Sequence, residues 1–199
     1  MVDQSTGMAQ RKHLENYFVG HASAEHQWPL GPAVSDLPWL RVVEFAPGPK
    51  ASGWIYATIG AYEARPERPI EFLLATDRSA PRFIELLTMT AWYHFKEGLD
   101  LGHTFAIGQP WLPSSACDHM LVSLPYPFGP VLEVCPLSTG DLHYYWLLPI
   151  TRSESEFKIR EGQQALEERF DADGIRFWDP GRASVVPDVP MPDAETRFG

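Results

Sequence analysis

The stretch of sequence that decides the fold is Pro81-Arg-Phe-Ile-Glu-Leu-Leu-Thr-Met-Thr-Ala-Trp-Tyr-His-Phe-Lys96. Its apolar side chains recur at every fourth position, at Phe83, Leu87, Ala91 and Phe95. This spacing is typical of one face of an α-helix. Proline is favoured in the first turn, with Ser79 as a candidate cap, and Gly98 is a typical stop. We therefore expect a helix over 81–96 that is largely buried against a sheet.

Strands are expected on both sides of this helix. Residues 39–46 and 54–61 are rich in β-branched and aromatic side chains, and the Pro47-Gly48-Pro49 turn between them predicts a hairpin. A third strand is expected at 70–76. The strands predicted after the helix are 119–124, 131–135 and 143–148, with short candidates at 175–178 and 183–186.

Two further helical regions are predicted. Residues 9–19 have apolar side chains at helical spacing and end at Gly20. The sequence Ser153-Glu-Ser-Glu156 has the form of a capping box, so a helix is expected to begin there, and Gly162 is expected to break it in two. Residues 21–38 are interpreted as a connection that contains several prolines.

The order of these elements indicates an α+β fold. Strands, a helix, more strands and a second helical region follow one another without the alternation of a doubly wound domain. We expect a mixed, largely antiparallel sheet with helices packed mainly on one face. No linker divides residues 9–186, which predicts a single domain, followed by an extended or flexible tail at 187–199.

Composition excludes several classes of function. The 199 residues carry a formal charge of −10, which argues against binding to nucleic acid or to an anionic membrane. The most apolar stretch, 120–134, is interrupted by prolines, and no signal peptide is visible. Two isolated cysteines, Cys117 and Cys135, predict buried free thiols in a reducing compartment. The sequence thus predicts a soluble cytoplasmic protein.

Half of the net charge comes from one part of the chain. Residues 83–150 contain six acidic residues and one base, Lys96, which gives that region a charge of −5. The six acidic residues are Glu85, Glu97, Asp100, Asp118, Glu133 and Asp141. They either form an ordinary solvated surface or a face that steers a basic partner.

The sequence contains none of the nucleophile-elbow, phosphate-loop, dinucleotide-binding or zinc-protease motifs. The segment from His94 to His103 and the run Cys117-Asp118-His119 offer the residue types of a metal site or an activated thiol. Their spacing fits a helix C-terminus and a structural cysteine better, because it matches no compact ligand motif. We expect no catalytic residue, no metal and no cofactor. The alternative is a small metal-dependent or Cys/His hydrolase built on His94, Asp100, His103 and Cys117.

Several segments resemble, in the same order, the suppressor of fused family. The match extends roughly over residues 14–186. The segments that carry it are Trp54–Gly60, Pro69–Leu74, Ile84–Phe95, Gly102–Thr104, Leu132–Leu137 and Phe157–Phe170. No single segment is specific, but the ordered set is, and it agrees with an α+β domain.

The resemblance implies a binding module and not an enzyme. Animal members bind and restrain a transcription factor and carry a further C-terminal domain, whereas bacterial members are single domains, many of which are regarded as immunity proteins against a toxin. The tyrosine on the long helix of the animal proteins matches Tyr93. The aspartate of their Gly-Asp-His segment is replaced here by His103, which puts the animal peptide-binding chemistry in doubt.

We therefore expect a protein partner, either a toxin domain or a regulatory protein. Trp111 lies between Pro110 and Pro113 and is expected to be an exposed contact residue in a loop. The predicted contact residues are Tyr93, Asp100, His103, Trp111, Asp118 and Asp141.

Overall fold

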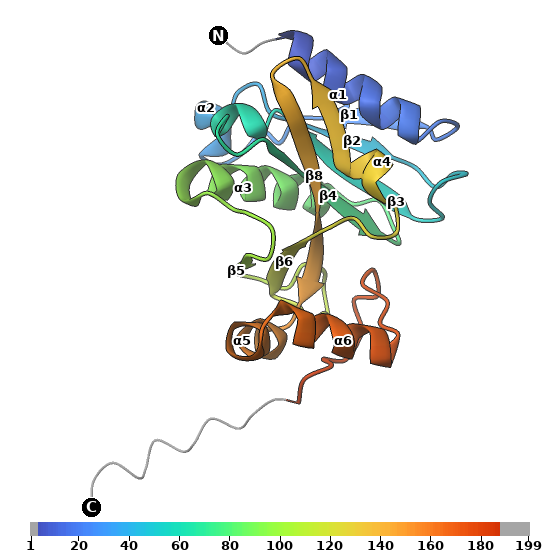
Figure 1. Cartoon of the computed structure of the whole chain (residues 1–199), viewed down its shortest axis with the longest axis vertical. Coiled ribbons are helices and arrows are strands. Elements are labelled where there is room, and N and C mark those ends of the chain that lie inside the picture. Colours follow the sequence, from blue (N-terminus) through green and yellow to red (C-terminus); the bar gives the residue numbers. More distant parts are fainter. Residues whose placement is uncertain (1–3, 188–199) are drawn as a thin grey trace, which may run out of the picture.

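The computed structural model describes residues 4–187 and contains one mixed sheet of eight strands. The strands are β1 (Ser23–His26), β2 (Arg41–Phe45), β3 (Trp54–Ile59), β4 (Ile70–Thr76), β5 (Thr104–Ala106), β6 (His119–Ser123), β7 (Val134–Leu137) and β8 (Gly140–Ile150). Their order is β1-β2-β3-β4-β8-β6-β5, and β7 pairs with the first half of β8. Only β4 and β8 run parallel, so the predicted mixed, largely antiparallel α+β fold is confirmed. Figure 1 shows β8 running from the level of α1 down to α5.

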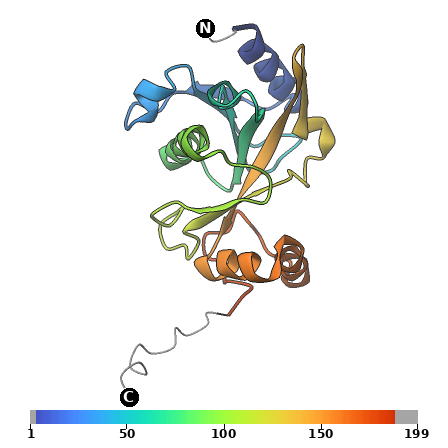
Figure 2. The same cartoon turned by 60° about the vertical axis from the view of Figure 1, so that its left-hand side comes forward.

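The helices are divided between the two faces of the sheet. They are α1 (Gln4–Tyr17), α2 (Ala33–Asp36), the 3-10 turn η1 (Tyr62–Ala64), α3 (Pro81–Glu97), α4 (Pro130–Glu133), α5 (Arg152–Glu161) and α6 (Gln163–Asp173). One hydrophobic core lies under α3, and a second contains side chains of α1, α5 and α6. Figure 2 shows α5 and α6 packed together at one end of β8.

The prediction that helices pack mainly on one face is therefore corrected. Successive residues of the central strands belong to opposite cores: Ile55 and Ala57 face the α1 side, and Tyr56 between them faces the α3 side. A strand that is apolar at consecutive positions must be covered on both faces. Residues 54–59 have little polar alternation, and this pattern is typical of a strand that is buried on both faces.

Four of the predicted strands, 39–46, 54–61, 70–76 and 119–124, and the main helix are confirmed within one or two residues. The β2–β3 hairpin forms as expected, and β4 matches the predicted 70–76. α3 begins at Pro81, but its cap position is Ala80, because the Ser79 hydroxyl donates to the Glu44 carboxylate (3.2 Å) instead. α1 begins earlier than predicted, and the connection 21–38 contains β1 and α2.

Three local predictions are wrong. The capping box of α5 starts two residues earlier than predicted: Thr151 Oγ1 accepts from Glu154 N (3.2 Å), and Glu154 Oε2 accepts from Thr151 N (2.8 Å). Gly162 does separate α5 from α6, as expected. Residues 130–133 form the turn α4 before β7 begins, because Pro130 favours a helical first turn.

The third error concerns residues 175–186, which form turns and not strands. A buried ion pair holds this segment in place of a strand ladder. Nη1 and Nη2 of Arg182 donate to the two carboxylate oxygens of Glu154, and both hydrogen bonds are 2.7 Å long. Glu154 also accepts a hydrogen bond from Val185 N (3.0 Å). Beyond Pro187, the predicted tail lies outside the described residues. No helix in the described range is both long and apolar enough to cross a bilayer.

Candidate functional site

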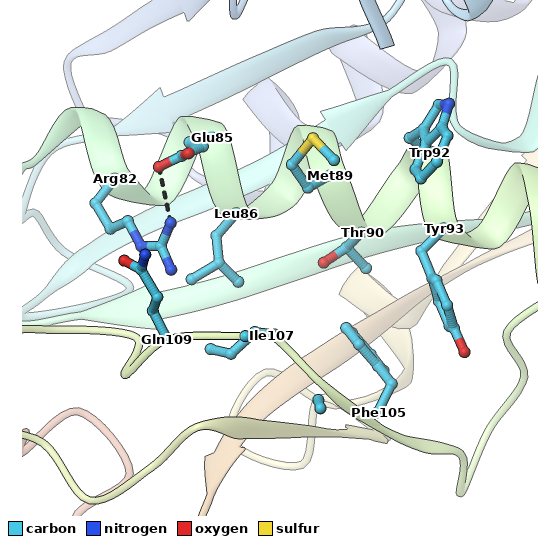
Figure 3. A pocket seen from close by; sticks show the side chains of 12 residues that line it. Arg82, Glu85, Leu86, Met89, Thr90, Trp92, Tyr93, Phe105, Ile107 and Gln109 are labelled. Atoms are coloured by element: carbon cyan, nitrogen blue, oxygen red, sulfur yellow. Dashed lines mark hydrogen bonds and ion pairs between the residues drawn. The ribbon is translucent and has the colours of Figure 1, made fainter. Parts of the chain in front are cut away.

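A groove of about 410 Å³ separates α3 from β5 and the residues that follow it. We call it the α3–β5 groove. Its helix wall consists of side chains three or four positions apart, and its other wall comes from β5 and the loop beyond it (Figure 3). The side chains that define it are Arg82, Glu85, Leu86, Met89, Thr90, Trp92, Tyr93, Phe105, Ile107 and Gln109. The groove is thus mainly apolar, with Thr90 and Gln109 as polar lining residues and an ion pair between Arg82 and Glu85 (2.8 Å) at one end.

Tyr93 and Phe105 close the other end of the α3–β5 groove. Their rings are stacked, with centroids 5.4 Å apart and planes 22° from parallel. Tyr93 is 38% exposed, whereas Phe105 is buried beneath it. Figure 3 shows the tyrosine extending from α3 toward the β5 side. Stacked aromatic side chains of this kind provide a large, rigid contact area with a polar tip.

One buried polar atom that lines the groove has no hydrogen-bond partner among the described residues. The Thr90 side chain is 2% exposed and lines the groove, and its Oγ1 makes no hydrogen bond within residues 4–187. A buried hydroxyl without a partner is costly, at about 1–3 kcal/mol. A ligand in the groove could satisfy it.

Asp36 of α2 contacts two side chains on the exposed side of α3. Its carboxylate accepts from Trp92 Nε1 (2.9 Å) and pairs with Lys96 Nζ (2.9 Å). The hydrogen bond from Lys96 lowers the pKa of the Asp36 carboxyl below its ordinary value, and the hydrogen bond from Trp92 has the next largest effect in the same direction. The contact fixes the indole of Trp92, a groove residue, against α2.

β5 is an edge strand, and its outer side has no partner strand among the described residues. His103 O accepts from Val122 N (2.9 Å) and Ile107 N donates to Asp118 O (2.9 Å), so both residues direct peptide groups to β6. In an antiparallel ladder this orientation alternates along the strand. The peptide groups of Thr104 and Ala106 therefore face away from β6, beside the groove.

Trp111 does not occupy the exposed position that was predicted. Its side chain is 0% exposed, its Nε1 donates to Ser115 Oγ (3.0 Å), and its ring lies 5.9 Å from that of Phe83 on α3. The flanking prolines suggested a solvated loop, but the loop folds back on α3 and buries the large apolar ring. Trp111 anchors the loop behind the groove and is not a surface contact.

The other predicted contact residues are exposed or half-buried but do not form one patch. Asp100 and His103 share a turn in which His103 N donates to Asp100 O (3.0 Å), two residues before Phe105. The Asp100 carboxylate lies 3.5 Å from Arg68 Nη1. Asp118 lies beside the end of β5, where its carboxylate is 2.7 Å from His119 Nδ1.

Asp141 is far from this group. It lies at the start of β8, opposite Pro136, whereas His119 pairs with Ile150 at the other end of the same strand. Nine residues of extended chain, at about 3.3 Å each, separate these ends by about 30 Å. The structure therefore brings Tyr93, Asp100, His103 and Asp118 near β5 and leaves Asp141 apart.

The residues of the hydrolase alternative have structural contacts. His94 is 0% exposed and its Nδ1 accepts from Leu99 N (3.0 Å). Burial and, secondarily, the charges of Arg65 and Arg68 lower the pKa of His94 to about 4. Burial raises the pKa of the Cys117 thiol, which keeps it protonated. Within residues 4–187, no three side chains of His, Cys, Asp or Glu are grouped as metal ligands.

Sequence reasoning missed most of the groove. The residues Arg82, Glu85, Met89 and Tyr93 form a stripe at helical spacing beside the buried one, and this second stripe was a usable signal. Phe105 and Ile107 gave no comparable signal, because β5 is only three residues long.

Comparisons with known proteins agree on one family. The sequence profile described as "Suppressor of fused protein" matches residues 37–183. A crystal structure of a suppressor of fused homologue from Neisseria gonorrhoeae is similar, with a TM-score of 0.82 and 32% identity over 93% of this chain and 99% of that one. No curated protein matches the sequence significantly.

Two more distant structures share the fold. A chain in the crystal structure of the Sufu–Fu complex has a TM-score of 0.68 and 13% identity, over 90% of this chain and 92% of that one. Drosophila Suppressor of Fused has a TM-score of 0.67 and 15% identity, and the similarity covers 93% of this chain but 54% of the Drosophila chain. At these identities the likeness is one of fold.

Proposed function

The chain belongs to the suppressor of fused protein family, and from this premise we propose that it is a non-catalytic protein-binding module that holds its partner at the α3–β5 groove. The observation that carries the proposal is the stacked Tyr93–Phe105 pair, because Phe105 lies on β5, whose outer side has no partner strand among the described residues. Exposed aromatic side chains over an apolar groove are typical of protein contacts.

The geometry favours an extended segment of the partner. Such a segment adds to β5 through the peptide groups of Thr104 and Ala106, which face away from β6. Its alternate side chains then enter the α3–β5 groove, where the Thr90 hydroxyl is available for a hydrogen bond. The main-chain hydrogen bonds supply affinity, and the groove selects the side chain.

We propose a toxin domain as the partner, which the chain neutralises as an immunity protein. The support is the similarity to a bacterial protein of nearly the same length and the net charge of −10, which favours a basic partner such as a nucleic-acid-cutting domain. Asp100, His103 and Asp118 lie near β5 and complete the proposed surface. Asp141 contributes through long-range charge, because it lies at the far end of β8.

The proposal is tested by calorimetry with the purified chain and a toxin domain, which is to be sought among the genes beside its own. Tyr93→Ala removes the exposed ring of the groove and is expected to weaken binding about 30-fold, as at an aromatic hot spot. Val19→Ala is the control, because Val19 is also an exposed apolar side chain but lines neither the groove nor any other pocket of the described residues. Equal affinity for wild type and Tyr93→Ala, or no binding of the toxin, would contradict the proposal.

A further inference from the structure

A second hollow lies between α6, the turn that follows β6 and the segment that follows α6, and it has a volume of about 500 Å³. We call it the Tyr126–Trp178 pocket. It shares no residue with the α3–β5 groove, and it opens on the side of the sheet that α6 covers. The residues that carry the inference are Ser123, Tyr126, Trp146, Glu167, Asp171 and Trp178.

The walls of this pocket are aromatic. Tyr126 and Trp178 are 61% and 44% exposed, and they are two of the three aromatic residues with such exposure among residues 4–187, the third being Tyr93. Below them, Trp146 meets Phe177 with ring centroids 5.3 Å apart. The left-handed residue Gly174 ends α6 and turns the chain back, which brings Trp178 to the rim.

The charge on the pocket is of one sign. Glu167 and Asp171 are four residues apart on α6 and so lie on the same side of the helix. Glu167 Oε1 accepts a hydrogen bond from the uncharged amide of Gln163 (Nε2, 2.7 Å). Among the described residues, no lysine, arginine or histidine lines the pocket. Partial burial, followed by the charges of Glu167 and Asp171, raises the pKa of the Tyr126 phenol, which agrees with this placement.

Two buried polar groups that line the pocket have no partner. Ser123 on β6 and Trp146 on β8 are paired across the sheet, and their side chains are 0% and 4% exposed. Neither Ser123 Oγ nor Trp146 Nε1 makes a hydrogen bond within the part of the chain that the structure describes. Buried groups of this kind are normally satisfied, so the pair points to a ligand that supplies both a donor and an acceptor.

We propose that the Tyr126–Trp178 pocket binds a lysine or arginine side chain of a partner protein. The cation lies against the rings of Tyr126 and Trp178 and between the carboxylates of Glu167 and Asp171. Its N–H groups can donate to Ser123 Oγ, and the peptide carbonyl of the same residue can accept from Trp146 Nε1. An anionic ligand would meet two like charges, and a purely apolar one would leave both buried polar groups unsatisfied. This inference does not depend on the proposed function of the α3–β5 groove.

The test is a titration of the full chain, labelled with ¹⁵N, with the capped tripeptides acetyl-Gly-Arg-Gly-amide and acetyl-Gly-Lys-Gly-amide. The proposal predicts shifts of the indole N–H signals of Trp146 and Trp178, with little change at Trp39, whose indole bonds Gly60 O on another part of the sheet. The same peptide with norleucine, which is neutral and of similar length, is expected to bind about tenfold or more weakly, because it lacks the cation–π and ionic contacts.

Two double variants separate the pocket from general charge. Glu167→Gln with Asp171→Asn is expected to weaken the arginine peptide about tenfold, since it removes both carboxylates of the pocket. Glu168→Gln with Asp173→Asn removes the same charge from α6 outside the pocket and is expected to leave binding unchanged. The proposal is overturned if neither basic peptide binds, if norleucine binds equally well, if both double variants have the same effect, or if free spermidine binds more tightly than the peptides.

Discussion

The two edges of the sheet are built differently. β1, at one edge, carries the charged side chain of Glu25, which pairs with Arg11 and lies 3.6 Å from Arg41, and the polar side chain of His26, which lies 3.7 Å from Glu44. β5, at the other edge, has no charged residue and adjoins the apolar α3–β5 groove. Charged side chains are a common means of preventing an edge strand from pairing with another chain.

The difference indicates which edge is available to a partner. The β1 edge is protected by ion pairs that an added strand would have to displace. The β5 edge is short, which limits aggregation, but its outer peptide groups have no partner strand among the described residues and lie beside a groove that can receive side chains. A protein can thus protect one edge of a sheet and use the other for recognition.

The largest effect is expected when the buried side chain that anchors the loop after β5 is removed. Trp111→Ala deletes a fully buried indole that packs on Phe83 of α3, and it is expected to lower the free energy of unfolding by about 3–5 kcal/mol. Urea unfolding measures this. Trp178→Ala, at a half-exposed position, is the control and is expected to cost less than about 1 kcal/mol. A loss below that value for Trp111→Ala would mean that the loop is not anchored as described.

Proline substitutions test which of the two edge strands binds the partner. Ala106→Pro removes an N–H that faces away from β6, and it is expected to weaken toxin binding about 100-fold while β5–β6 pairing persists. Ser23→Pro likewise removes an outward-facing N–H from β1. Ala22 O accepts a hydrogen bond from Ala46 N at the end of β2, and because the orientation alternates along the strand, the peptide groups of Ser23 face away from β2. Its expected effect on affinity is less than about threefold, because β1 is not the docking edge. Calorimetry compares them, and a larger effect at Ser23 would reverse the assignment.

Acid pH is expected to weaken the packing of α3 on the sheet, where the ring of His94 meets that of Phe72 on β4. His94 is buried and neutral, with its pKa lowered to about 4 from 6.5, so the unfolded chain binds this proton more readily. The stabilisation is complete above about pH 6.5 and is lost as the pH falls toward 4, by about 2–3 kcal/mol. Protonation also removes the acceptor of Leu99 N. Urea unfolding across this range should show a smaller loss for His94→Gln, and identical pH profiles would contradict the argument.

The smallest effect is expected at the charged edge. Glu25→Ala removes the exposed ion pairs of β1 and should change the free energy of unfolding by less than about 1 kcal/mol, with a smaller effect in high salt. Thermal unfolding at low and high ionic strength measures this. A loss of several kcal/mol would show that these ion pairs hold the edge together and do not merely protect it.

The sequence predicted the fold more fully than the site. β4 and α3 were found because a continuous apolar run and a four-residue period are local signals. The segment 175–186 was misread as strands because the Glu154–Arg182 pair that holds it joins residues 28 positions apart. No local pattern reveals such a contact.

The site depended still more on distant contacts. Tyr93 was identified through the family resemblance, but its partner Phe105 comes from a strand of three residues. Trp111 was placed on the surface because its neighbours are prolines, although its ring is buried against α3. The sequence left open whether the acidic residues of 83–150 share one face, and the structure separates them because β8 carries Asp141 to the far end of the sheet.

The central claim is that a partner binds at the β5 edge, and hydrogen–deuterium exchange of the toxin complex tests it most directly. The account predicts that binding protects the amides of Thr104 and Ala106 together with Tyr93 and the adjacent turn of α3. The amides of Ser23 and Glu25 on β1 should exchange at the same rate in the free and bound chain. Protection at β1 with unchanged exchange at β5 would contradict the account.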